Sequence, residues 1–134
     1  MAILLSYLSF NGNCKEAMSF YQECLGGTLE LRTIGESPVA GQFPDSEKEK
    51  IMHGESRTHH GILFGSDMEQ NSEVLKGRKV SLFLKCDSVD EIEDLYHKFL
   101  PKSKVVDPLK KQFWGGTFGI LDDEFGMTWM FECD

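Results

Sequence analysis

A histidine and a glutamate separated by one residue are the strongest candidates for chemistry in this chain. His53 and Glu55 lie in a stretch with the composition of a strand, Lys50 to Arg57, where alternate side chains share a face. Neutral imidazole and carboxylate oxygen are strong donors for divalent metals, so the pair could reach one ion. Two donors do not complete a metal site, and an isolated strand histidine is more often part of a hydrogen-bonded structure. Both interpretations stay open at this point.

The cysteines lack the partners that catalysis needs. Cys14 and Cys24 lie on a predicted helix with no neighbouring base, so nothing supports a catalytic thiol. With Cys86 and Cys133 they form no C-x-x-C pair, and each lies in an apolar segment. We predict that all four are small core residues in a reducing compartment. No G-x-S-x-G elbow, Walker loop or H-E-x-x-H motif occurs either.

Two copies of one strand–helix pattern must position these residues. In the first copy a strand-like segment precedes a helix that Asn13 would cap, with Glu16 reaching back to complete a capping box. In the second copy Ser88 and Glu91 hold the same places. The distance from Asn13 to Ser88 is 75 residues, and the same offset aligns Ser6 with Ser81. We therefore predict an internal repeat.

Each copy continues with three predicted strands, which gives the order β-α-β-β-β twice. The strands before the two helices are Ile3 to Phe10 and Lys79 to Cys86; the others are Thr28 to Ile34, Lys50 to Arg57, His60 to Ser66, Lys102 to Asp107, Gln112 to Leu121 and Met127 to Cys133. The segment Gly35 to Glu49 exceeds the usual connection of about 4–6 residues, so it is either a ligand lid or solvated slack. Asp67 to Arg78 is the predicted linker. The sequence thus predicts one domain over residues 1–134, with module one about 1–67 and module two about 79–134.

The end of the chain carries a dense pattern of rings and glycines, W-G-x-x-x-G-x-x-x-D-x-F-G-x-x-W, from Trp114 to Trp129. Gly115 and Gly119 inside a strand predict bulges or a close approach of the backbone. The sequence "DDEFG" predicts a tight hairpin. We expect Trp129 and Phe131 to be core residues, whereas Trp114, beside the glycines, is a candidate for the wall of a pocket.

Together with "YLSFNGNCKEAMSFYQECLGG" and "IMHGESRTHHGILFGSD", this tail resembles the vicinal oxygen chelate superfamily (glyoxalase I, bleomycin-resistance proteins and extradiol dioxygenases). Within it the chain resembles the PhnB-like family, whose members have carried the label 3-demethylubiquinone-9 3-methyltransferase. The resemblance implies an α+β fold in which two βαβββ modules form curled mixed sheets around a cup-shaped cavity, with helices on the convex faces. The methyltransferase label is not supported, because neither strand-to-helix turn, "NGN" or "DSV", is the glycine-rich turn of the common α/β type of adenosylmethionine enzyme.

The superfamily implies a divalent metal held by four inward-facing histidines or glutamates. Carrying those positions over gives Ser6, Ser81, Met130 and either Phe64 or Gly65, none of which is a strong donor for such a metal. We therefore predict a protein that binds a small, partly apolar molecule without the usual metal and without another cofactor. The predicted pocket residues are Ser6, Leu8, His53, Phe64, Ser81, Phe83, Trp114 and Met130.

The alternative function is a metal-dependent lyase, isomerase or dioxygenase that uses a divalent metal at a relocated site near His53 and Glu55. The residues do not decide whether the chain is an enzyme, and they assign no catalytic residue.

The charge balance and the sheet edges narrow the partners. The chain has 14 Lys and Arg residues against 22 Asp and Glu residues, and its net charge of −8 disfavours nucleic acid. No apolar run reaches the ~20 residues that a membrane span needs, and no signal-peptide pattern opens the chain, so we predict a cytoplasmic protein without a membrane partner.

Exposed sheet edges favour pairing with another strand, and the resemblance implies that modules pair to close each cup. We predict a homodimer; the alternative is a monomer that pairs its own two modules.

Overall fold

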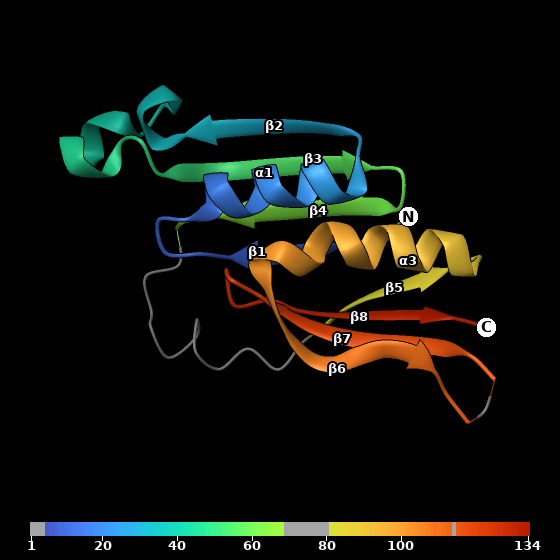
Figure 1. Cartoon of the computed structure of the whole chain (residues 1–134). Coiled ribbons are helices and arrows are strands. Elements are labelled where there is room, and N and C mark those ends of the chain that lie inside the picture. The colour runs from blue at the N-terminus through green and yellow to red at the C-terminus, as the bar shows by residue number, and fades with distance from the viewer. Residues whose placement is uncertain (1–4, 69–80, 114) are drawn as a thin grey trace. The chain divides into compact units, whose positions relative to one another are not determined.

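In the residues that the structure describes, the fold has two four-stranded mixed sheets, each with one α-helix (Figure 1). The computed structural model describes residues 5–68, 81–113 and 115–134, and the chain divides into two units, residues 1–78 and 79–134. Both units follow the order β-α-β-β-β, which confirms the predicted α+β class and the internal repeat. No helix in the described part of the chain is long and apolar enough to cross a membrane.

In the first unit the helix packs on one side of the sheet. The elements are β1 (Ser6–Ser9), α1 (Cys14–Leu25), β2 (Thr28–Thr33), β3 (Ile51–Thr58) and β4 (Gly61–Ser66). The strand order is β1-β4-β3-β2, with β1 parallel to β4 and the other pairs antiparallel. Cys14 and Met18 of α1 are fully buried on the side of the helix that faces the sheet, and they lie against Gly65 of β4. A Cβ at Gly65 would come within 3.0 Å of the Met18 sulfur. The absence of a side chain at Gly65 lets the helix approach the sheet.

The N-terminus of α1 is capped from a distance of more than fifty residues. Asn13 makes no side-chain capping bond. Instead, Asp67 Oδ1 accepts hydrogen bonds from the backbone N–H groups of Gly12 (2.8 Å) and Cys14 (3.0 Å), and Oδ2 accepts one from Ile51 N (2.9 Å). A buried carboxylate satisfies these donors and places negative charge at the positive end of the helix dipole. The predicted Asn13 capping box is therefore wrong, and Asp67 is an anchor of the first unit rather than the first residue of a linker.

The second unit repeats the arrangement with a locally capped helix. Its elements are β5 (Leu82–Cys86), α3 (Val89–Phe99), β6 (Ser103–Lys111), β7 (Thr117–Asp123) and β8 (Thr128–Cys133), in the sheet order β5-β8-β7-β6. Ser88 Oγ accepts a hydrogen bond from Glu91 N at 3.1 Å, which confirms the predicted start of this helix. Trp129 and Phe131 are buried against the helix, with ring centroids 4.6 Å (Phe99–Trp129) and 5.5 Å (Tyr96–Phe131) apart. Their predicted place in the core is confirmed.

The glycine-rich tail differs from its predicted boundaries. The strand expected over Gln112 to Leu121 begins only at Thr117, because Gln112 and Gly116 close a turn (Gln112 N to Gly116 O, 2.7 Å). Gly115 in this turn has a φ of 99°, which side chains rarely adopt. Gly119 does lie within a strand, and a Cβ there would come within 3.0 Å of the Leu109 backbone. The predicted close approach of the backbone at Gly119 is therefore confirmed. Trp114 lies outside the described residues.

One buried hydroxyl in the first unit makes no hydrogen bond with any residue that the structure describes. Ser56 is 0% exposed on the side of β3 that faces α1. Removing a buried, unsatisfied hydroxyl leaves no partner behind, so we expect Ser56→Ala to leave the free energy of unfolding unchanged or to raise it by up to about 1 kcal/mol. Urea unfolding monitored by circular dichroism measures this change.

Ser66 is the matched control for Ser56. Its buried hydroxyl donates to Met52 O (2.8 Å) and accepts from Met68 N (3.0 Å), so Ser66→Ala should cost about 1–2 kcal/mol. A Ser56→Ala protein that loses as much stability as Ser66→Ala would show that Ser56 has a partner after all.

Candidate functional site

The face of the first sheet that points away from α1 collects aromatic and charged side chains; we call it the open face. Strand pairing sets Arg32 opposite His53, Glu30 opposite Glu55, and Phe64 between Glu55 and Tyr7. Because side chains alternate along a strand, these six residues share one side, while Leu63 and Gly65 point to the helix. The predicted common face of His53 and Glu55 is therefore present.

Three rings lie beside one another on the open face. The ring centroids of His53 and Phe64 are 5.2 Å apart, and Tyr7 lies 6.2 Å from each of them. These distances fall in the range of aromatic pairs. Tyr7 is nevertheless 56% exposed. The ring planes are tilted by 36–42° to one another, so the three rings form a shallow, partly exposed apolar surface that an aromatic group could contact.

Two hollows that share Arg32 and His53 border the rings. The larger, about 460 Å³, is also lined by Met52 and by residues Glu36 to Pro38 of the long loop. The smaller, about 220 Å³, is completed by Glu30 and Glu55. A shift in the β2–β3 register between Arg32 and Thr33 interrupts the strict alternation where Met52 and His53 both reach the larger hollow.

The long loop supplies one wall of this site. It contains three short turns, η1 (Ile34–Glu36), η2 (Ala40–Gln42) and η3 (Asp45–Glu47). Its start is tied down by a capping box, in which Thr33 Oγ1 donates to Glu36 Oε1 at 2.8 Å and accepts from Glu36 N. Hydrogen bonds from Ile34 N and Gly35 N to the end of the loop hold its two ends together. The part of the loop beside His53 is therefore a fixed wall.

The charged groups of the open face differ in how far they are already paired. Arg57 donates to both oxygens of Glu55, at 3.0 and 3.4 Å. The hydrogen bonds from Thr33, with Arg32 nearby, hold the pKa of Glu36 below its usual value. Among the residues that the structure describes, Glu30 and Arg32 make no ion pair and no side-chain hydrogen bond. These two side chains are available to a ligand.

A third hollow, near the N-terminus of α1, is less suited to a ligand. It measures about 580 Å³ and its lining includes Lys48 and Lys50. Both lysines are engaged in ion pairs, with Asp45 at 2.9 Å and Glu47 at 2.7 Å. Asp67, which also lines it, is committed to the helix cap. Three of the charged groups that line this hollow, Lys48, Lys50 and Asp67, are therefore already engaged in the fold.

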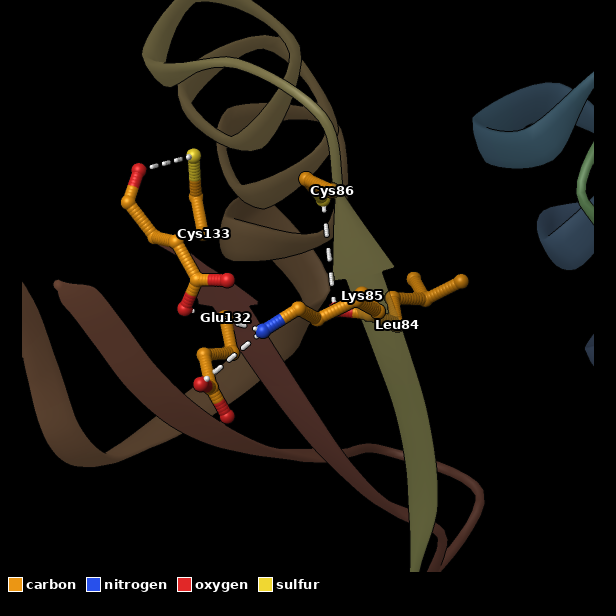
Figure 2. A network of polar contacts seen from close by, with 6 residues as sticks. Leu84, Lys85, Cys86, Glu132 and Cys133 are labelled. Atoms are coloured by element: carbon orange, nitrogen blue, oxygen red, sulfur yellow. Dashed lines mark hydrogen bonds and ion pairs between the residues drawn. The ribbon is translucent and has the colours of Figure 1, made fainter.

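The second sheet also has a face away from its helix. Phe83 and Met130 are strand partners there, and Phe83 is 49% exposed. At the end of the same face Lys85 pairs with Glu132 at 3.2 Å, as Figure 2 shows, and with Asp134 at 3.0 Å. These bonds raise the pKa of Lys85, with Asp134 the larger cause. Ser81 precedes β5 and is exposed. Phe83 and Met130 are thus the predicted residues that this unit brings together.

Ser6 and Leu8 lie on the other side of their sheet. Leu8 is only 8% exposed and pairs with Gly65, which points to α1, and Ser6 follows the same alternation. Tyr7, which was not predicted, takes the place on the open face that Phe83 has in the second unit. Tyr7 and Phe83 are 76 residues apart, whereas the helix caps Asn13 and Ser88 are 75 apart. An alignment at 75 therefore moves the first strand by one residue and exchanges its faces.

The residues that would have to hold a metal do not fit one. Over residues 5–68, 81–113 and 115–134, no three His, Cys, Asp or Glu side chains lie close enough together to bind an ion. His53 and Glu55 share a face, but both oxygens of Glu55 already bond to Arg57. Structural and catalytic zinc sites need at least three protein ligands. His53 and Glu55 therefore do not make a metal site by themselves.

The four cysteines are buried free thiols. Burial raises the pKa of Cys14 to about 12, and the carboxylates of Asp67 and Glu16 add to this effect; burial likewise raises the pKa of Cys86 to about 11. A thiol is a poor nucleophile while it holds its proton, so neither residue is suited to covalent chemistry.

The raised thiol pKa predicts a loss of stability at alkaline pH. In the unfolded chain Cys14 ionises near its ordinary pKa of 9.0, whereas the folded protein keeps the proton until about pH 12. The stability from this group is thus complete below about pH 9 and falls as the pH rises toward 12. We expect the urea concentration at the unfolding midpoint to decrease as the pH is raised from about 9 to about 12. This decrease should be less steep in Cys14→Ala. An identical pH dependence in the two proteins would contradict the assignment.

Comparison with known proteins places this geometry in context. The family model described as Glyoxalase/Bleomycin resistance protein/Dioxygenase superfamily matches residues 3–131. Protein YjdN of Escherichia coli (strain K12) is 29% identical over 143 residues, covering 95% of this chain and 92% of YjdN. The crystal structure of protein PA1353 from Pseudomonas aeruginosa has a TM-score of 0.82 and 35% identity, covering 100% of this chain and 98% of that one.

A second solved structure shows the same fold at lower identity. It is a PhnB protein from Bacillus cereus whose name offers 3-demethylubiquinone-9 3-methyltransferase only as a candidate activity. Its TM-score is 0.73 at 21% identity, covering 99% of this chain and 100% of that one.

Proposed function

The chain belongs to the glyoxalase/bleomycin resistance protein/dioxygenase superfamily, and from that premise we propose that it binds a small, partly apolar molecule on the open face of its first sheet. The hollow of about 460 Å³ beside His53 carries this proposal. Its volume lies within the ~300–1,000 Å³ of most small-molecule sites, and an exposed ring surface with a few polar groups adjoins it. Binding without a metal and without catalysis is the simplest use of these residues.

A thermal-shift screen with an unbiased small-molecule library tests this function. A ligand of the open face should raise the melting temperature of the natural protein, and Tyr7→Ala and His53→Ala should weaken its binding about tenfold or more, because each removes part of the contact surface. His60→Ala, an exposed turn residue, is the matched control and should bind normally. A ligand that ignores both open-face variants would overturn the proposal.

The competing function is a metal-dependent lyase, isomerase or dioxygenase at His53 and Glu55, which is favoured only by their common face. Metal analysis of protein purified without a metal-affinity tag separates the two functions. We expect substoichiometric metal that is the same in His53→Ala. A stoichiometric transition metal that disappears in His53→Ala would establish the metal-dependent function instead.

We further propose that the protein is a cytoplasmic homodimer in which the first module of one chain faces the second module of the other. The exposed ring surfaces around Tyr7 and Phe83 support this, since such surfaces often mark contact sites. Sedimentation equilibrium at micromolar concentration should give twice the chain mass of 15.2 kDa. A single species near the chain mass would contradict the dimer.

A further inference from the structure

Glu30 and Arg32 carry opposite charges on the open face and form no ion pair with each other. They are two residues apart on β2 and point to the same side of the sheet. Neither forms an ion pair or a side-chain hydrogen bond with a residue that the structure describes, and the charge of Arg32 helps to lower the pKa of Glu36. The smaller hollow, about 220 Å³, is lined by these two residues and their strand partners His53 and Glu55. Its lining therefore presents one available carboxylate and one available guanidinium.

The charges of the lining select among ligand classes. A simple anion would gain Arg32 but would face the carboxylates of Glu30 and Glu55. A simple cation would gain Glu30 but would face Arg32. A molecule with both charges satisfies Glu30 and Arg32 together, and a guanidinium fork is well matched to a carboxylate. Glu55 stays with Arg57, at 3.0 Å.

The rings specify the remainder of the ligand. His53 lines both hollows and belongs to a cluster of three rings with Phe64 and Tyr7, in which Tyr7 lies equally far from the other two. An apolar group bound next to the charged pair would lie against this cluster. Offset stacking on exposed rings favours an aromatic group over a branched aliphatic one.

We infer that the open face binds a small zwitterion with an ammonium group, a carboxylate and an aromatic ring, the class to which aromatic α-amino acids belong. Glu30 takes the ammonium, Arg32 takes the carboxylate, and the rings of His53, Phe64 and Tyr7 take the aromatic group. This assignment rests on the proposed function, because it names the class of molecule for the same face.

A matched series of probes tests each charge separately. L-Phenylalanine, L-tyrosine and L-tryptophan carry the full pattern, phenethylamine lacks the carboxylate, and 3-phenylpropionate lacks the ammonium. Isothermal titration should show that at least one amino acid binds about tenfold or more tightly than both truncated probes, since a bond to a charged group is lost in each.

Charge-removing variants should then separate the two roles. Arg32→Gln should weaken amino-acid binding about tenfold and leave phenethylamine unchanged; Glu30→Gln should weaken the amino acid and phenethylamine and leave 3-phenylpropionate unchanged. Lys98→Gln and Glu23→Gln, exposed positions on α3 and α1, are controls of equal charge change. The inference is supported only if each variant weakens the binding of the probes that carry the matching charge and leaves the probe without that charge unchanged.

Three outcomes would overturn the inference that the ligand is a zwitterion. They are no binding of any of the three amino acids at millimolar concentration, equal binding of a truncated probe, or affinities unchanged in both charge variants. The proposed function fails separately: it stands if a ligand from the screen is still lost in Tyr7→Ala and His53→Ala, and it falls if that ligand ignores those variants.

Discussion

Replacing Asp123 with alanine is expected to lower the free energy of unfolding by about 3–5 kcal/mol, the largest effect that we predict for a single residue. Asp123 is 6% exposed, and its carboxylate accepts hydrogen bonds from Phe125 N (2.9 Å), Met127 N (2.9 Å) and Trp129 Nε1 (2.8 Å). Its carboxylate thus closes the β7–β8 turn and fixes the buried indole. Alanine would remove the acceptor of these bonds.

Urea unfolding followed by far-UV circular dichroism measures this loss, and the indole N–H resonance of Trp129 reports on the local bond. Asp123→Asn keeps one oxygen as an acceptor and should lose only part of the stability. Glu124→Ala changes the next, exposed residue and should shift stability by less than about 0.5 kcal/mol. Equal stabilities for Asp123→Ala and Glu124→Ala would refute the role of the buried carboxylate.

Replacing Asp67 with alanine should cost about 2–4 kcal/mol. Both of its oxygens are used: one joins Gly12 and Cys14 at the start of α1, and the other holds Ile51 at the start of β3. Alanine removes the negative charge at the helix N-terminus and takes away the acceptor of three backbone N–H groups. Amide hydrogen exchange should speed up at Cys14 and Ile51, and the urea midpoint should fall.

Asn13→Ala is the matched control for Asp67, because Asn13 occupies the cap position without making a capping bond. It should change stability by less than about 0.5 kcal/mol, whereas Ser88→Ala, which removes a real capping bond, should cost about 1 kcal/mol. An Asn13→Ala protein less stable than Asp67→Ala would reverse the assignment of the cap.

Local patterns were sufficient to predict most of the fold. The α3 helix begins where Ser88 and its apolar face predict, because its cap is four residues long and depends on nothing remote. The cap of α1 could not be found in this way, since its acceptor, Asp67, is 53 positions beyond Cys14. Asn13 has the right residue type for a cap, and only the folded chain shows that another carboxylate holds the N–H groups.

The candidate site was predictable to a smaller extent for a related reason. The common face of His53 and Glu55 could be predicted because alternation along a single strand is a local property. Tyr7 was missed, although it alternates with Leu8 and Phe10, both of which are buried. The alignment of Ser6 with Ser81 hid that alternation. The contributions of Arg32 and Pro38 depend on the β2–β3 register and on the path of the long loop, which no short motif encodes.

The one-residue difference between the strand repeat and the helix repeat bears on how such chains tolerate changes of length. It falls between Phe10 and Asn13 in the first unit and between Cys86 and Ser88 in the second, in the connection from strand to helix. A codon gained or lost inside the strand would turn every later side chain of that strand to the opposite face, whereas one in the connection leaves both the strand and the helix in phase. Tandem duplicates of this kind can therefore diverge in length at that connection while each keeps its core. Chimaeras that exchange the first strand between related proteins should accordingly be joined in the connection from strand to helix. The exchanged strand should be aligned so that its aromatic residue falls at the position of Tyr7 or Phe83.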